Sequence, residues 1–218
     1  MKKGRKIFLI GIGMLLSLAN TLAAFAEDYS VLGTYVKNGY ENEYFGYRIE
    51  LPSDYELVTR SILQSVDKSM ERTIEDSNSE STLSWLNSSL NLSSAKVFEA
   101  QSDTDYMCVS VETPGFMKDY WDEEETIAKN TAEEVEKNLS SSNESVTVSG
   151  VSTTVDYLDD FIDGKHYAIS YKCLLNDVPY YGIEIIVRSK DKNYISIFEF
   201  ASFDADHIEV MCDYCSKL

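Results

Sequence analysis

The segment Asn38–Tyr55 reads NGYENEYFGYRIELPSDY and contains the clearest structural pattern in the chain. Large apolar side chains alternate there with small or charged ones, in the order Phe45, Gly46, Tyr47, Arg48, Ile49, Glu50, Leu51. Because successive side chains of an extended strand point to opposite sides, this alternation predicts a half-buried strand. Pro52 cannot donate to a sheet ladder, so the strand is expected to end at Leu51. We interpret it as the opening strand of a single globular domain over residues 39–218.

The residues before this domain have the features of an export signal. Lys2, Lys3, Arg5 and Lys6 form a basic head, and a short apolar run over residues 7–18 follows it. Ala24 and Ala26 place small residues where a signal peptidase reads, so residues 1–26 are predicted to be a secretory signal peptide. The apolar run is too short for a typical membrane span. Residues 27–38 are expected to be a polar, partly mobile lead-in. The predicted location is secreted or extracellular, or periplasmic if the source has an outer membrane.

The predicted mature chain is strongly acidic. The signal contains four of the 19 basic residues and none of the 37 acidic ones, which leaves 15 basic against 37 acidic residues and a formal charge of −22. The electrostatic field of such a negative chain repels nucleic acid and anionic membrane surfaces, so neither is expected as a partner. No membrane insertion is expected after signal cleavage. The acidity is consistent with solubility outside the cell, and also with attraction to cations or to a basic partner.

Along the rest of the chain, apolar periodicity predicts a mixture of helices and strands. Helices are expected at residues 61–74, 83–90, 122–139 and 204–216. Extended segments are expected at residues 95–100, 106–112, 145–149, 151–161, 166–174, 180–188 and 194–202. Asp163-Gly164 is predicted to be the two-residue turn of a hairpin. The predicted class is α+β, with an antiparallel sheet meander and helices packed on the sheet.

In this order of elements, the segment Tyr44–Pro52 resembles the opening strand of secreted bacterial proteins with a PsbP-like fold. The later segment Val146–Gly150, with the long hairpin and closing helix that follow it, also resembles these proteins. The resemblance covers nearly all of the mature chain and rests on structural motifs. It implies a PsbP-like α+β sandwich that acts as a non-catalytic binding or accessory domain. The resemblance transfers no functional residue to this chain.

The pair Cys212 and Cys215 forms a C-x-x-C motif late in the predicted last helix. A redox role requires a thiol of low pKa at a helix N-terminus, and a zinc site requires four ligands, which the spacing does not supply. The leading interpretation places both thiols in the core as small apolar groups. A disulfide that involves Cys173 or Cys108 is the alternative, so the state of all four cysteines stays open.

Three further motifs are weaker. The loop Asp159–Gly164 lacks the ligands of an EF-hand, although a looser cation site there remains an alternative. Ser65-Val66-Asp67-Lys68 matches S-x-x-K without the Lys-Thr-Gly element that should accompany it. The two histidines, His166 and His207, lack an identifiable nucleophile. No catalytic, cofactor or metal residue is therefore assigned, and no cofactor is expected.

The 15 tyrosines include several without a clear place in the core, namely Tyr40, Tyr44, Tyr120 beside Trp121, and Tyr180-Tyr181. Exposed aromatics can anchor partners, whereas partial burial with a hydrated hydroxyl is the simpler interpretation.

The leading functional hypothesis is an exported, non-catalytic binding or accessory domain whose partner is another extracellular protein or a cell-surface component. The alternative is a secreted hydrolase that acts through paired carboxylates, which requires a cleft with two acids of displaced pKa.

Overall fold

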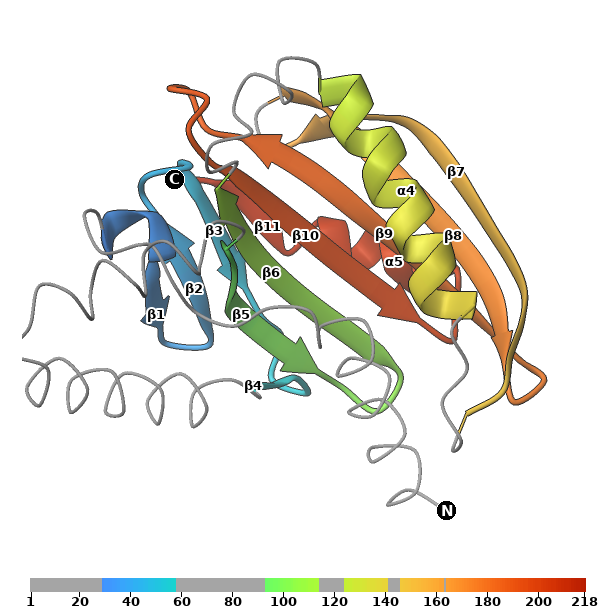
Figure 1. Ribbon diagram of the computed structural model, residues 1–218. Coiled ribbons are helices and arrows are strands. Elements are labelled where there is room, and N and C mark those ends of the chain that lie inside the picture. Colours follow the sequence, from blue (N-terminus) through green and yellow to red (C-terminus); the bar gives the residue numbers. More distant parts are fainter. Residues whose placement is uncertain (1–28, 58–92, 114–123, 141–145, 163) are drawn as a thin grey trace, which may run out of the picture.

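The computed structural model describes residues 29–57, 93–113, 124–140, 146–162 and 164–218 (Figure 1). Within these residues, strands dominate and form two antiparallel sheets. In chain order the elements are η1 (Tyr29–Leu32), β1 (Thr34–Val36), β2 (Gly39–Asn42), β3 (Tyr47–Glu50), β4 (Glu56–Leu57), β5 (Ser93–Gln101), β6 (Asp105–Thr113), α4 (Glu124–Ser140), β7 (Val148–Phe161), β8 (Gly164–Leu175), β9 (Val178–Arg188), β10 (Ile195–Ser202), α5 (Asp206–Cys212) and β11 (Cys215–Lys217).

The larger sheet has seven strands in the order β4-β5-β6-β10-β9-β8-β7. The meander from β7 to β10 follows the chain, and β10 then pairs with β6, with Phe198 opposite Val109. Central strands of this sheet are covered on both faces, so Met107 and Val109 face one side of β6 while Tyr106 and Cys108 face the other, and all four are buried. The predicted strands at residues 95–100, 106–112, 166–174, 180–188 and 194–202 are confirmed.

The smaller sheet has the order β1-β2-β3-β11 and contains the opening strand. Its predicted register is confirmed over Tyr47–Glu50, because Tyr47 and Ile49 are fully buried, Arg48 is half-buried and Glu50 is exposed. Phe45, which was expected on the inner face, lies in the turn before the strand and is half-buried. Gly39 on β2 lies so close to β3 that a Cβ there would be 2.0 Å from the Ile49 carbonyl oxygen, so only glycine fits. This sheet also contains β1, which lies in the lead-in that we expected to be partly mobile.

The main apolar core lies between the two sheets. Tyr47 packs against Phe198 with a ring-centroid distance of 4.7 Å, and its hydroxyl lies 3.0 Å from the Ser196 hydroxyl. From α5, Met211 enters the same core and is fully buried. The small sheet and α5 therefore cover one face of the central strands, and their burial is a large part of what stabilises the domain.

The helix α4 covers the other face of the large sheet, where it packs on β7 and β8 (Figure 1). Its buried stripe recurs at helical spacing and consists of Ile127, Ala128, Ala132, Val135 and Leu139. The first turn contains Glu124 and Glu125, which suit the positive end of the helix dipole, and Lys129 lies 2.7 Å from Glu125 one turn later. The predicted helix at residues 122–139 is confirmed over its described part.

The predicted class, an α+β sandwich of helices packed on one meander sheet, is wrong. The described chain is mostly β, and its first and last strands form a second sheet in place of a helical layer. The expected last helix over residues 204–216 ends at Cys212, because the chain turns and Cys215–Lys217 pairs with β3. The expected helices at residues 61–74 and 83–90 lie outside the described residues.

The hairpin between β7 and β8 also turns one residue earlier than expected. Phe161 pairs with Gly164, and Ile162 adopts a positive φ of 61°, so the loop does not consist of Asp163-Gly164.

No helix among the described residues combines the length and the apolar character that a membrane crossing requires.

Candidate functional site

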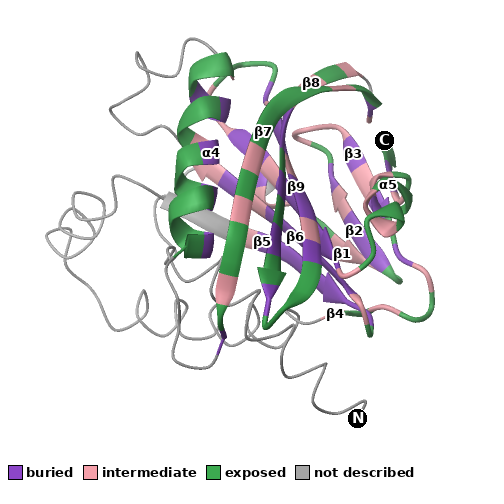
Figure 2. Ribbon diagram, turned by 90° about the vertical axis from the view of Figure 1, so that its right-hand side faces the viewer, coloured by how far each residue is buried: buried purple, intermediate pink, exposed green. Residues whose placement is uncertain are grey.

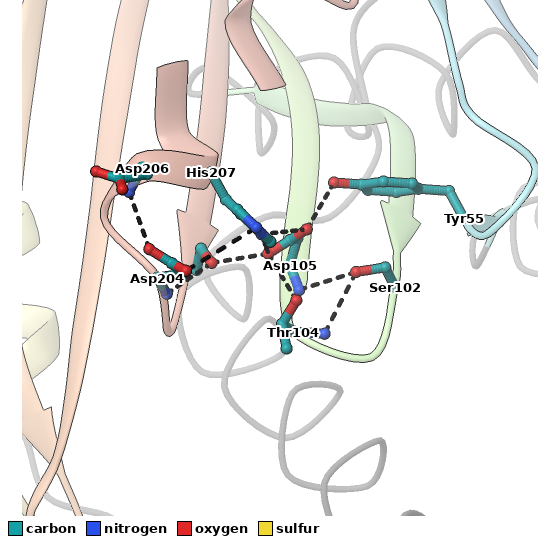
Figure 3. Close-up of polar contacts among 8 residues, drawn as sticks. Tyr55, Ser102, Thr104, Asp105, Asp204, Asp206 and His207 are labelled. Atoms are coloured by element: carbon teal, nitrogen blue, oxygen red, sulfur yellow. Dashed lines mark hydrogen bonds and ion pairs between the residues drawn. The ribbon is translucent and has the colours of Figure 1, made fainter. Parts of the chain in front are cut away.

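The most connected polar cluster centres on Asp105, at the start of β6 (Figure 3). Its carboxylate accepts hydrogen bonds from Ser202 Oγ at 2.7 Å, Thr104 Oγ1 at 3.0 Å and Tyr55 OH at 3.1 Å. His207 Nδ1, from α5, lies 3.0 Å from Asp105 Oδ1. The cluster joins the end of β10, the start of α5 and the segment after β3, which are far apart in the sequence.

The charges of this cluster stabilise one another. Burial alone would raise the pKa of Asp105, but the hydrogen bonds from Ser202, His207 and Thr104 hold it below its usual value. The hydrogen bond to Asp105 in turn raises the pKa of His207. An aspartate on Nδ1 is how a catalytic histidine is oriented. Here, however, the Ser202 hydroxyl donates to Asp105 and not to the imidazole. Within the described residues the cluster therefore offers His207 no nucleophile to activate, and it fixes α5 to the sheet.

A second polar cluster lies on the α4 face of the large sheet. Glu99, Cys108, Glu199 and Glu184 occupy one rung across β5, β6, β10 and β9. Lys96 is 3.0 Å from Glu99. Burial raises the pKa of Glu199 to about 7, and burial together with the Glu199 charge raises that of Glu184. This pair meets the pKa requirement of the predicted hydrolase, but Glu199 is only 8% exposed.

The C-x-x-C motif does not form a reactive site. Cys215 is buried in the core between the sheets, and Cys212 is half-buried at the end of α5. Burial raises the pKa of Cys212 to about 12 and also raises that of Cys215, so both thiols stay protonated at neutral pH. All four cysteines are free in the structure, with Cys108 and Cys173 in the core beneath α4.

The remaining sequence candidates fall in different places. Asp159 and Asp160 are exposed near the tip of the β7–β8 hairpin, and Asp159 lies 3.5 Å from Lys165. In the described part of the chain, no three His, Cys, Asp or Glu side chains are arranged to hold a metal ion. His166 lies on β8, at the base of that hairpin. Ser65 and its S-x-x-K motif lie outside the described residues.

The tyrosines are mostly structural. Tyr40 and Tyr180 are fully buried, and Tyr181 is half-buried. Tyr44 is half-buried and donates a hydrogen bond of 2.5 Å to Asp191, which joins the β2–β3 turn to the β9–β10 turn. Tyr120 and Trp121 lie outside the described residues. The four candidates that the structure describes, Tyr40, Tyr44, Tyr180 and Tyr181, do not form an exposed aromatic platform.

The outer edge of β7 is the surface that sequence reasoning did not identify. β7 spans 14 residues and ends the large sheet, and no described strand pairs with its outer side (Figure 2). Register shifts between Ser149 and Ser152 and between Leu158 and Phe161 leave a regular stretch, Ser152–Leu158, between two irregular ones. Bulges disturb a strand edge locally, so this stretch is the regularly paired part of β7.

The turn between β8 and β9 shows which backbone groups of β8 point toward β9 and which point toward β7. Asn176 and Asp177 both have positive φ, at 49° and 64°, and form a two-residue turn closed by the pair Leu175–Val178. The closing pair of such a turn exchanges hydrogen bonds, so Leu175 points its backbone groups toward β9. Asn176 N donates to Thr147 O at 2.8 Å, on the opposite side. Even-numbered residues of β8 therefore bond to β7.

These even-numbered residues of β8 pair with even-numbered residues of β7 from Ser152 to Leu158. The backbone groups of Thr153, Val155 and Tyr157 consequently point away from the sheet. An independent observation agrees, because Tyr157 N donates to the Asp156 carboxylate at 2.7 Å and not to β8. The side chains of Val155 and Tyr157 are 36% and 45% exposed, so both count among the exposed large apolar groups of the described chain.

Side chains fix one end of this edge. The Tyr157 hydroxyl donates to the Tyr167 hydroxyl on β8, and their ring centroids are 4.2 Å apart. Lys165 Nζ lies 4.2 Å from the centroid of the Tyr157 ring. The edge is thus a partly apolar strand on which the outward N–H donors of Thr153 and Val155 meet no partner strand among the described residues. The sequence signal is the alternation of residues 152–158, which we interpreted only as an extended segment.

No protein-family model matches the chain, and no curated protein matches it significantly. The resemblance to PsbP-like proteins stays a prediction.

Proposed function

We propose that this protein is an exported binding domain that adds an extended segment of a protein partner to the outer edge of β7. The observation that carries the proposal is the row of outward backbone groups at Thr153 and Val155, in the regularly paired stretch between two bulges. An extended peptide that pairs with a sheet edge gains main-chain hydrogen bonds, and side-chain contacts give it specificity.

The edge alone supports only weak binding. Four backbone hydrogen bonds, two donated and two accepted by Thr153 and Val155, contribute about 1 kcal/mol each. Even before the cost of association is subtracted, a total of about 4 kcal/mol corresponds to a dissociation constant of only about 1 mM. The exposed side chains of Val155 and Tyr157 provide the additional apolar contact that a useful affinity requires.

A partner outside the cell agrees with the predicted signal peptide. If the signal is cleaved after Ala26, the secreted chain begins at Glu27, and intact-mass analysis of secreted material checks this. A mass that retains residues 1–26 would contradict the export part of the proposal. The partner is then another extracellular protein or a cell-surface component.

A hydrolase remains the second candidate, and the Glu184–Glu199 pair is the observation that favours it. Glutamates that face each other on neighbouring strands, with raised pKa values, are suited to share a proton. The low exposure of Glu199 argues against this candidate, because a substrate must reach the carboxylate. Loss of a hydrolytic activity in a Glu199→Gln variant would favour it over the binding domain.

The test of edge binding uses two proline variants of the full chain. Val155→Pro removes an outward N–H without breaking the β7–β8 ladder, so this variant is expected to keep its melting temperature within a few degrees. Thr154→Pro removes a ladder hydrogen bond and is expected to lower the melting temperature clearly. Equal losses in both variants would show that the assigned backbone directions are wrong.

Binding is measured with a random heptapeptide library displayed on phage and selected against the wild-type chain. Selected peptides are expected to lose binding to Val155→Pro and to bind Val155→Thr with only a modest loss, because threonine preserves the N–H, the strand propensity and one of the two methyl groups. A library that yields no peptide with this dependence contradicts the proposed function.

A further inference from the structure

The edge of β7 has one outward donor that is already occupied. The N–H of Tyr157 donates to Asp156 Oδ1 at 2.7 Å, within the chain. The same outward row at Thr153 and Val155 has no such side-chain acceptor among the described residues. A partner strand that approaches the edge therefore finds two donors available and a third that is covered by a carboxylate.

Asp156 differs from the neighbouring acids in its charge environment. Asp159 lies 3.5 Å from Lys165, and Glu125 lies 2.7 Å from Lys129. No cation of the described residues forms an ion pair with Asp156, which is exposed. Within the described part of this strongly acidic chain, its negative charge on the edge of β7 is thus unpaired.

Two kinds of partner strand are distinguished by this arrangement. A Lys or Arg opposite Asp156 can draw the carboxylate away from the Tyr157 N–H, and that donor then bonds to a carbonyl of the partner. The paired segment becomes longer and gains an ion pair. An acidic residue at the same place meets like charge, and the Tyr157 N–H stays covered.

We propose that Asp156 determines the specificity of the β7 edge, and that the partner segment is basic, with a Lys or Arg opposite Asp156. This inference rests on the proposed function, since it names the chemistry of the segment that β7 binds. The same carboxylate disfavours pairing between two copies of this acidic chain, because an unpaired charge on an edge strand opposes edge-to-edge association.

The expected selectivity combines two modest effects. An exposed ion pair contributes about twofold to fivefold in affinity, and one additional backbone hydrogen bond contributes about as much. A Lys-containing segment is therefore expected to bind about tenfold more tightly than the same segment with Glu, and the difference should shrink at high salt.

The experiment repeats the heptapeptide selection on the full wild-type chain and on the Asp156→Asn variant. Asparagine keeps an oxygen that can accept from the Tyr157 N–H but removes the charge, so the fold and the covered donor are preserved. Peptides selected on the wild type are expected to be enriched in Lys and Arg, and the enrichment should disappear with Asp156→Asn. Synthetic Thr-Val-Thr-Lys-Thr-Val-Thr and its Glu counterpart, titrated at low and high salt, give the affinity ratio.

The possible outcomes separate the two proposals. Binders that depend on Val155 but show no basic enrichment overturn the role of Asp156 and leave edge binding intact. The absence of any Val155-dependent binder overturns both. Concentration-dependent dimers of the wild-type chain in sedimentation experiments, abolished by Val155→Pro, would show that the occupant is a second copy and would also overturn the basic-partner inference.

Discussion

The ring of Tyr171 on β8 lies over Gly182 on β9, and its hydroxyl donates to Glu199 on β10 at 3.4 Å. A Cβ on residue 182 would be 2.1 Å from Cζ of the tyrosine ring, so the position accepts only glycine while the ring stays in place. Glycine in a strand interior usually weakens a sheet, and here it allows a side chain to cross a neighbouring strand. The relationship links three strands beneath α4.

Replacement of Gly182 by alanine is therefore expected to destabilise the domain. The ring of Tyr171 must leave a fully packed site, and overpacking of this kind costs about 1–3 kcal/mol. Gly164→Ala is the matched control, because its Cβ would meet only His166 Nε2, at an ordinary 3.7 Å. The midpoint of urea denaturation should fall clearly for Gly182→Ala and stay nearly unchanged for Gly164→Ala. Similar midpoints for the two variants would contradict the assigned packing.

Substitutions on the two faces of the opening strand are expected to differ in their effect on stability. Ile49 is fully buried between the sheets, and its truncation to alanine is expected to cost about 2–5 kcal/mol. Phe45 is only half-buried, so Phe45→Ala should cost less than a fully buried phenylalanine would. Glu50→Ala, on the exposed side of the strand, should change stability by less than about 0.5 kcal/mol. Chemical denaturation of the three variants measures this order, and a greater loss for Glu50→Ala would reverse the register.

Local patterns predicted the strands well and their assembly poorly. Alternation at Tyr47 and Ile49 identified the buried face of β3, because side chains of a strand alternate whatever the strand pairs with. The pairing of β3 with Cys215–Lys217 depends on contacts between the two ends of the chain. A three-residue strand has no periodicity of its own, so the helical spacing of Ile208 and Met211 was extended too far.

The candidate site could likewise be predicted from the sequence only in part. The sequence identified residues 151–161 as extended, but the exposure of one edge is a property of the sheet order and not of the strand. The hydrogen bond from the Tyr157 N–H to Asp156 is local in sequence. It matters for binding only because this N–H points away from β8, and the direction of a backbone group depends on the strand pairing. The Glu184–Glu199 pair likewise arises from register, since 15 residues separate the two acids in the sequence.

Glu199 is expected to make the stability of the domain fall as pH rises. Burial raises its pKa to about 7 in the folded state, above that of an unfolded glutamate. A group of this kind favours folding most below its unfolded pKa, and the contribution is lost as the pH rises through the folded pKa. Glu199→Gln keeps the size of the side chain and cannot ionise. The stability of this variant relative to the wild type should therefore increase from pH 5 to pH 8, on the order of 1 kcal/mol or more.

Thermal denaturation at pH 5 and pH 8 checks this, with Glu56→Gln as a control on an exposed acid of the same sheet. A wild type that is as stable as Glu199→Gln at pH 8 would show that Glu199 ionises in the folded state without cost.

The Asp105–His207 pair predicts a stability window with two limits. The pKa of Asp105 is lowered on folding, so its contribution is present above about pH 4 and is lost as the pH falls through the folded value. The pKa of His207 is raised, chiefly by the hydrogen bond to Asp105, so its contribution is complete below about pH 6.5 and is lost as the pH rises through the folded value. The pair therefore stabilises the domain most between about pH 4 and pH 6.5.

The imidazole of His207 is 45% exposed, so solvent screens the pair and its contribution is about 0.5–1 kcal/mol. For a chain of this size, 1 kcal/mol corresponds to about 2–4 °C in melting temperature. His207→Gln should lower the melting temperature by up to that amount at pH 5.5 and by less at pH 8.5, while His166→Gln should preserve the pH dependence of the wild type. Because Glu199 acts equally in both chains, the difference between wild type and His207→Gln isolates the pair. A difference that grows from pH 5.5 to pH 8.5 would mean that His207 is neutral when it contacts Asp105.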